Sequence, residues 1–281
     1  MKLKALNTAT FKLDGGSMFG VVPKVLWQKV YPSDENNLCT WALRCLLIET
    51  ANRKIIIDCG IGDKQNEKFM GNFHLENYKS FDEILSSYSL NTDQITDVIL
   101  THLHFDHCGG AVKYNSDKTG FEATFKNATY WIGKKQWDLA NSPNSREKAS
   151  YLKENFVPLL DTGHVKFIEK DIEICENISV RIYNGHTSGQ VIPFVNYNRK
   201  TLVFMADFIP TSAHLPLAWV ISFDTQPLVS LSEKEKFLIE AVQNNYTLFF
   251  EHDLYTDCCT VAQTEKGIRV KDKFQLDFFI D

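Results

Sequence analysis

Short, continuous runs of hydrophobic residues recur along the chain, and Gly, Asn or Asp residues separate many of them. Runs of about four to eight such residues between turn-forming residues are typical of buried β-strands. They predict strands at Leu43–Ile48, Lys54–Ile57, Asp97–Leu100, Ile178–Tyr183, Val191–Val195, Thr201–Met205 and Thr247–Phe250. Turns at residues 51–53 and 196–199 would join neighbouring strands into hairpins.

Two segments have the spacing of amphipathic helices instead. Tyr78–Tyr88 places hydrophobic residues every three or four positions, which would give one apolar face. Ser232–Asn244 begins with a potential N-cap, Ser232, and carries Glu233 and Glu235 in its first turn, where negative charge suits the helix dipole. Strands and helices therefore alternate in two series, which favours an α/β fold with two sheets packed face to face and helices outside.

Composition narrows the class of protein. A chain of 281 residues with 44% hydrophobic and 23% charged residues fits one globular domain spanning residues 1–281. The net charge of −5 argues against nucleic acid as a partner. We see no signal peptide and no apolar run long enough to cross a membrane. The seven cysteines form no CxxC pair, which favours reduced thiols in a cytoplasmic protein and argues against a cysteine-based zinc site.

Histidine and aspartate residues concentrate just after four of the predicted strands. Three of the eight histidines fall within six positions directly after Leu100, and an aspartate lies among them. Because open sheets place their sites at the carboxyl ends of strands, we expect these side chains to form one site. Imidazole and carboxylate are usual zinc ligands, and the spacing offers a second metal position. The candidate ligands are His102, His104, Asp106, His107, His186, Asp207 and His252.

The HxHxDH motif at residues 102–107, with the later histidines and aspartate, resembles the metallo-β-lactamase superfamily. The resemblance implies a four-layer αβ/βα sandwich, with two mixed β-sheets face to face and helices on both outer faces. It also implies one metal ion on His102, His104 and His186, a second on Asp106, His107 and His252, and Asp207 bridging both. By the same resemblance Asp58 would orient a metal-bound histidine. The alternative for Asp58 is a turn-forming aspartate before Gly60.

Two adjacent divalent cations lower the pKa of a shared water, so that a bridging hydroxide becomes available near neutral pH. Asp106 is the natural proton shuttle in such a centre. Zinc is favoured because His104 stands where iron-using members of the superfamily commonly have a glutamate. Manganese, cobalt or iron could occupy the same ligands.

Two segments indicate the substrate. Residues 13–27 resemble the amino-terminal segment of the branch that contains acyl-homoserine-lactone lactonases and methyl-parathion-type hydrolases. In this interpretation Met18, Phe19 and Trp27 line a hydrophobic pocket beside the metals. The alternative is an N-terminal hairpin that only covers the core.

The second segment, residues 205–219, begins at the bridging aspartate, so Phe208 and His214 are candidate substrate contacts. Better-known lactonases have a tyrosine three residues after this aspartate, and here the position is Pro210. We expect His214 to hold or protonate the substrate oxygen in its place, and a structural role is the alternative. The segments together predict a quorum-quenching lactonase that takes a small-molecule lactone or ester.

Three other functions stay open. A phosphotriesterase would share the metals and the N-terminal segment. A glyoxalase II-type thioester hydrolase is less favoured, since residues 275–281 are acidic and apolar where a basic glutathione site would lie. A non-catalytic zinc protein would close each metal with four protein ligands, whereas seven ligands for two metals leave positions for water. A homodimer is compatible with the sequence.

Overall fold

A computed structural model describes residues 1–280 of the chain, and they form two compact units. Unit 1 contains residues 1–10 and 43–170, and unit 2 contains residues 11–42 and the chain from Asp171 onward. The chain passes between the units within β1 (Lys2–Asp14) and again within β2 (Leu38–Glu49). Within the described residues, no helix has the length and apolar character that crossing a membrane requires.

The six-stranded sheet of unit 1 has the order β1-β2-β3-β4-β7-β8. Its further strands are β3 (Lys54–Ile57), β4 (Asp97–Leu100), β7 (Thr129–Gly133) and β8 (Val165–Ile168). β3, β4, β7 and β8 run parallel to one another, while β2 and β3 pair antiparallel. Because parallel strands end at the same edge, β4 delivers the chain that follows it to the carboxyl edge of this sheet.

Short helices and one hairpin complete unit 1. They are α3 (Glu67–Gly71), α4 (Phe81–Ser86), α5 (Phe105–Cys108), α6 (Lys134–Asn141), β5 (Val112–Tyr114) and β6 (Phe121–Ala123), with 3₁₀ turns at Thr92–Gln94, Gly109–Ala111, Lys148–Ser150, Lys153–Asn155 and Val157–Thr162. The predicted helix Tyr78–Tyr88 is shorter, because Ser80 and Glu83 form a capping box that fixes its start at Phe81. Its apolar face packs into the core of unit 1, as expected.

The seven-stranded sheet of unit 2 has the order β15-β14-β13-β12-β11-β10-β9. The strands are β9 (Ile172–Cys175), β10 (Ile178–Tyr183), β11 (Gln190–Tyr197), β12 (Lys200–Phe204), β13 (Thr247–Phe249), β14 (Cys258–Thr264) and β15 (Gly267–Phe274). All neighbours are antiparallel except β12 and β13, which are parallel. The crossover between these two contains α7, as parallel pairing requires.

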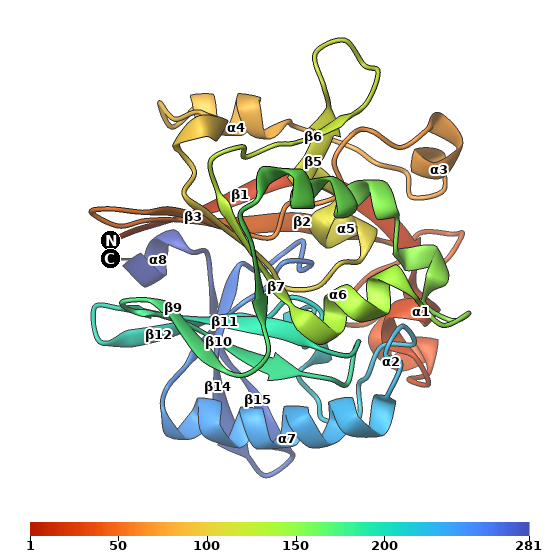
Figure 1. The fold of residues 1–281 in the computed structure, drawn as a ribbon. Helices are drawn as coiled ribbons and strands as arrows, with labels where there is room; N and C mark the ends of the chain where they lie inside the picture. Colours follow the sequence, from red (N-terminus) through yellow and green to blue (C-terminus); the bar gives the residue numbers. More distant parts are fainter. Residues whose placement is uncertain (281) are drawn as a thin grey trace. The chain divides into compact units, whose positions relative to one another are not determined.

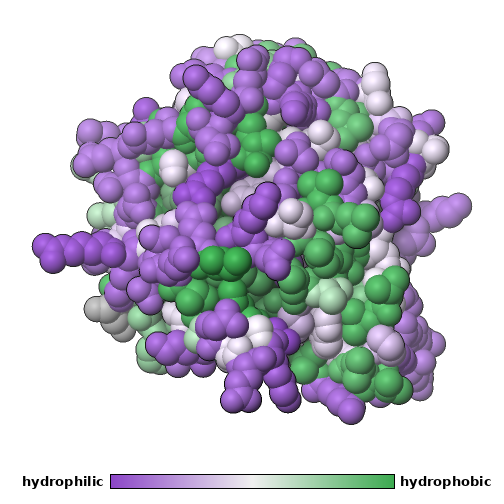
Figure 2. All heavy atoms as spheres, turned by 90° about the horizontal axis from the view of Figure 1, so that it is seen from below, coloured by the Kyte–Doolittle hydropathy of each residue, from purple (hydrophilic) through white to green (hydrophobic). Residues whose placement is uncertain are grey.

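The helices of unit 2 are α1 (Gly15–Phe19), α2 (Lys24–Trp27), α7 (Pro227–Gln243) and α8 (Asp277–Ile280), with a 3₁₀ turn at Ser212–His214. α7 packs against β14 and β15 (Figure 1). Figure 2 views the molecule from the side of α7, where hydrophilic and hydrophobic residues are both exposed. The prediction that Ser232 caps α7 is wrong, because the helix begins at Pro227, whose missing N–H costs nothing in the first turn. Two mixed sheets with helices confirm the predicted α/β class.

Candidate metal centre

Unit 1 brings together the four candidate ligands of the HxHxDH motif. β4 ends at Leu100, and α5 begins at Phe105 with His104 as its N-cap. The Nε2 atom of His102 lies 3.1 Å from Nδ1 of His104. The Nε2 atom of His107 lies 3.8 Å from a carboxylate oxygen of Asp106. The three histidines are buried, so their nitrogens meet at the end of the strand away from bulk water.

Asp58 contacts His107 directly and is linked to His102 through Thr101. One carboxylate oxygen lies 3.1 Å from Nδ1 of His107 and also accepts the Thr101 hydroxyl proton at 2.5 Å. The other oxygen accepts the Thr101 backbone N–H at 2.7 Å. Since the Thr101 hydroxyl gives its only proton to Asp58, its oxygen accepts from Nδ1 of His102, 3.1 Å away. Both imidazoles are thereby held with an unprotonated Nε2, as metal ligands require.

These contacts support the orienting role predicted for Asp58 over that of a turn residue alone. Sequence reasoning missed Thr101, which links Asp58 to His102. Its place between a buried strand and the first histidine of the motif was the available signal.

Unit 2 brings together the other three candidates around Asp207. One oxygen of this carboxylate lies 3.2 Å from Nε2 of His186, and the other lies 3.0 Å from Nε2 of His252. At their opposite nitrogens, His186 faces Asp224 at 2.9 Å and His252 faces the carbonyl oxygen of Ala42 at 2.9 Å. A carboxylate whose two oxygens face different, anchored imidazoles has the form of a ligand shared by two metals. The donor set of each unit therefore fits divalent metal ions.

The backbone before Asp207 is strained. Ala206 has a φ of 42°, in the left-handed region that residues with a Cβ rarely adopt. Such conformations persist where the surrounding structure enforces them, and they cluster at functional sites. Ala206 lies between the end of β12 and Asp207, whose carboxylate faces the two imidazoles.

His214 is buried and has both ring nitrogens engaged. Nε2 lies 2.8 Å from the carbonyl oxygen of Met18, and Nδ1 lies 2.8 Å from the hydroxyl of Thr211. The ring stacks on Phe19 with centroids 4.5 Å apart. Burial lowers the pKa of His214 to about 3, so the imidazole is neutral at physiological pH. These contacts favour the structural alternative over the expected role in holding or protonating substrate.

The other predicted substrate contacts also lie inside unit 2. Met18, Phe19 and Trp27 are buried, and the rings of Phe19 and Trp27 stack 5.1 Å apart. The N-terminal segment therefore packs into the interior of unit 2, as the core-covering alternative expects, although it forms the short helices α1 and α2 and not a hairpin. Phe208 packs between Tyr183 and Phe237, with centroids 4.2 Å and 5.3 Å away. The cavity of unit 2 that Asp207, Phe208 and His214 help to line has a volume of about 10 Å³, too small for a lactone.

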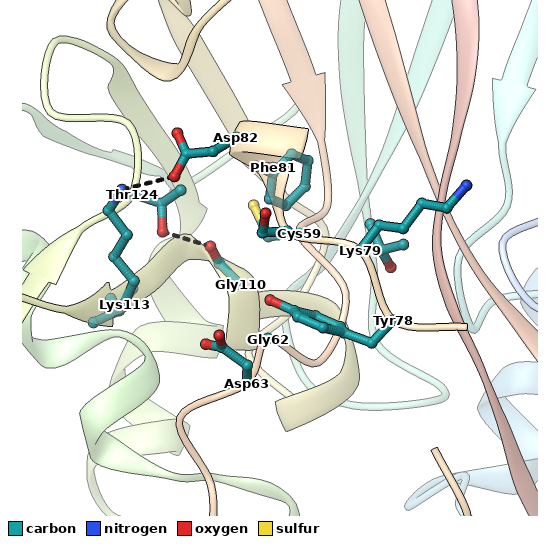
Figure 3. Close-up of a pocket in the computed structure, with 13 residues that line it drawn as sticks. Cys59, Gly62, Asp63, Tyr78, Lys79, Phe81, Asp82, Gly110, Lys113 and Thr124 are labelled. Atoms are coloured by element: carbon teal, nitrogen blue, oxygen red, sulfur yellow. Dashed lines mark hydrogen bonds and ion pairs between the residues drawn. The ribbon is translucent and has the colours of Figure 1, made fainter. Parts of the chain in front are cut away.

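A separate cavity of unit 1, with a volume of about 110 Å³, is drawn in Figure 3. None of the candidate metal ligands is among the described residues that line it. Lys113 pairs with Asp82 at 3.2 Å, and the Thr124 hydroxyl donates to the Gly110 carbonyl at 2.7 Å (Figure 3). These polar side chains are engaged with neighbouring groups of unit 1, and the lining residues include no candidate metal ligand.

Comparison with known proteins adds a family and several relatives. The family model described as the metallo-beta-lactamase superfamily matches residues 44–252, which include the HxHxDH motif and all three candidate ligands of unit 2. An N-acyl homoserine lactonase of Bacillus cereus is 25% identical over 254 residues, covering 85% of this chain and 88% of that protein. The N-acyl homoserine lactonase AiiA of Bacillus thuringiensis subsp. kurstaki is 24% identical over 249 residues, covering 83% and 86%.

Solved structures show the same fold over nearly the whole chain. A probable metal-dependent hydrolase from Staphylococcus aureus is 32% identical, with a TM-score of 0.89, and the match covers 97% of this chain and 96% of that one. AidC, a dizinc quorum-quenching lactonase solved with its product, is 18% identical with a TM-score of 0.78, covering 97% and 95%. The second likeness, at this low identity, is one of fold alone.

Proposed function

We propose a dinuclear hydrolytic centre for this chain, which belongs to the metallo-beta-lactamase superfamily and is a metal-dependent hydrolase. In this centre one ion would bind His102, His104 and His186, the other would bind Asp106, His107 and His252, and Asp207 would bind both. The observation that carries the proposal is Asp207, each of whose oxygens lies within 3.2 Å of a different imidazole nitrogen. Zinc is the favoured metal because the donors are mostly imidazoles. Manganese, cobalt and iron are the alternatives.

When bound, two such ions would supply an activated water near neutral pH and a Lewis acid for the substrate carbonyl. The chain's own residues would orient the imidazole ligands and transfer a proton to the leaving group. Asp58, Thr101 and Asp224 hold imidazoles in the tautomer that ligation needs. Asp106 is partly exposed, unlike the histidines around it, so it is our candidate to take a proton from the attacking water and return it to the leaving alkoxide.

The proposed substrates are N-acyl homoserine lactones. The support is the likeness to proteins named N-acyl homoserine lactonases, which extends over more than four fifths of both chains. Pro210 stands where better-known lactonases have a tyrosine, and His214 is engaged inside unit 2. The substrate oxygen would therefore have to be bound by a group other than Pro210 and His214.

The test loads the purified protein with zinc and follows acid release from N-acyl homoserine lactones of short, medium and long acyl chains. We expect ring opening, and a loss of about a thousandfold or more in His104→Ala and Asp207→Ala. His164→Ala is the matched control, because His164 is an exposed histidine of unit 1. A phosphotriester and a glutathione thioester are assayed in parallel.

The outcomes separate the hypotheses. Faster turnover of the phosphotriester or the thioester than of every lactone would replace the substrate assignment and leave the metal centre standing. Metal binding without turnover of any of the three substrate classes would favour the non-catalytic zinc protein.

A further inference from the structure

Lys234 of α7 is a buried lysine whose ammonium group binds backbone carbonyls. Its side chain is 3% exposed, and no ion pair of Lys234 occurs among the described residues 1–280. Nζ donates to the carbonyl oxygens of Pro216 and Trp219, both at 2.9 Å, and to that of His214. The three N–H groups of an ammonium thus meet three acceptors. Burial lowers the pKa of Lys234 to about 7, against the opposing effect of the Asp224 carboxylate, and these carbonyls are the hydrogen-bonding contacts that hold the buried side chain.

The three carbonyls belong to one loop, residues 211–219, which begins four residues after Asp207. Asp253 holds its start, since this carboxylate accepts the backbone N–H and the hydroxyl of Ser212 at 2.9 and 2.7 Å. Apart from one 3₁₀ turn, the loop has no regular structure to pair its backbone. In its second half the Trp219 N–H donates to the Pro216 carbonyl at 2.9 Å, and Lys234 contacts the carbonyl oxygens of both residues.

Glu233, the residue before Lys234, holds a second loop, but its carboxylate accepts hydrogen bonds from backbone N–H groups where Lys234 donates to carbonyls. Its carboxylate accepts the backbone N–H groups of Asn184 and Gly185 at 3.0–3.1 Å, directly before His186. The loop also lies tightly on α7, because a Cβ at Gly185 would stand 2.4 Å from the Cα of Ser230. Consecutive residues of one helix thus fix the loop that carries a candidate metal ligand and the loop that follows the bridging aspartate.

We infer that Glu233 and Lys234 are positioning residues with separate tasks: Glu233 sets the His186 loop for metal binding, and Lys234 sets loop 211–219 for substrate binding. The inference deepens the proposed function and rests on it, because only that function places the two loops beside metal and substrate. Residues on a 17-residue helix are suited to this work, since the loops have few backbone hydrogen bonds of their own.

The experiment compares Glu233→Gln and Lys234→Met by hydrogen–deuterium exchange, metal titration and steady-state kinetics. The matched controls are Glu235→Gln and Lys236→Met, which change exposed residues of the same helix. In K234M we expect amide exchange at residues 213–220 to rise about tenfold while residues 184–188 stay protected. KM for the lactone should rise about tenfold with kcat little changed, and metal affinity should match that of the unaltered protein.

In E233Q the pattern should reverse. Exchange should rise at residues 184–188, and affinity for one of the two zinc ions should fall about tenfold. Equal loosening of both loops in both variants, or no change in either, would overturn the inference. Lys234→Gln, which keeps two donors, replaces K234M if that variant does not fold, and the same exchange pattern at lower amplitude is expected. Exchange needs no substrate, so an absent lactonase activity would refute the proposed function without deciding this inference.

Discussion

At the scale of single residues, the state of each imidazole is set by what its second nitrogen contacts. His102, His107, His186 and His252 have Nδ1 held by a hydroxyl, a carboxylate or a carbonyl, whereas His214 has both nitrogens held inside unit 2. In the first four histidines, the contact at Nδ1 leaves Nε2 as the nitrogen that would bind a metal ion. In His214 both nitrogens are engaged, so neither is available for proton transfer to a substrate. The groups that contact its ring nitrogens therefore decide which role each histidine can take.

The Thr101 hydroxyl should matter for metal binding although it contacts no metal. We expect Thr101→Val, which keeps the shape and removes the hydroxyl, to lower the affinity for one of the two ions by about tenfold. Thr101→Ser retains the hydroxyl and should bind as the unaltered protein does. Competition with a chromophoric zinc chelator measures both, and equal affinities for T101V and T101S would show that the hydroxyl does not orient His102.

His214 should act on stability and not on the chemical step. Its folded-state pKa of about 3 is below its ordinary value of 6.5, so the neutral form stabilises the fold fully above about pH 6.5 and that contribution is lost as pH falls toward 3. Urea unfolding at pH 7.5 and 5 should show a larger loss for the unaltered protein than for His214→Gln. His164→Gln, an exposed histidine, is the control. A hundredfold fall in kcat of H214Q with intact folding would restore the proton-donor role.

The role of His214 could not be predicted from the sequence, because its partner Met18 lies 196 positions away and no local pattern reports such a contact. The candidate metal ligands could be picked out from the sequence because each lies within a few residues after a hydrophobic strand. Asp58 was found through its strand in the same way, and Thr101 was missed because its hydroxyl acts through another residue.

At the scale of elements, every predicted hydrophobic run overlaps a strand, but β1, β7, β14 and other strands were not predicted, and helix ends were located poorly. β3, β4 and β10 have the predicted bounds, since buried runs end where polar turn residues begin. β15 was missed because its residues are exposed or half-buried and offer no apolar run. The start of α7 was missed because the signal is Pro227, outside the amphipathic stretch.

The capping box of α4 provides a test at this scale. Ser80→Ala removes the hydroxyl that accepts the Glu83 backbone N–H, so we expect the free energy of unfolding to fall by about 1 kcal/mol. Ser116→Ala, in an exposed turn of the same unit, should change it little. Urea denaturation measures both, and equal effects would mean that the cap does not set the start of α4.

At the scale of the whole molecule, the candidate ligands divide between the units, four in unit 1 and three in unit 2. The sequence predicted one domain spanning residues 1–281, and this stays a prediction. The chain crosses between the two units within β1 and again within β2. The family match over residues 44–252 includes long parts of both units.

Metal removal should therefore destabilise both units. Metal ions that bind only the folded state stabilise it according to their concentration over Kd, so a chelator should lower Tm by several degrees. Hydrogen exchange should rise at residues 101–108 in unit 1 and at residues 184–188 and 205–209 in unit 2. Restored protection after zinc addition is the control, and a response confined to one unit would mean that the metals bind there alone.

The most direct measurement of the central claim is anomalous diffraction at the zinc edge from crystals of the metal-loaded protein. The account predicts two adjacent peaks per chain, with Asp207 reaching both and the six other ligands divided three to each. A single peak, or two peaks whose ligands all come from one unit, would contradict it.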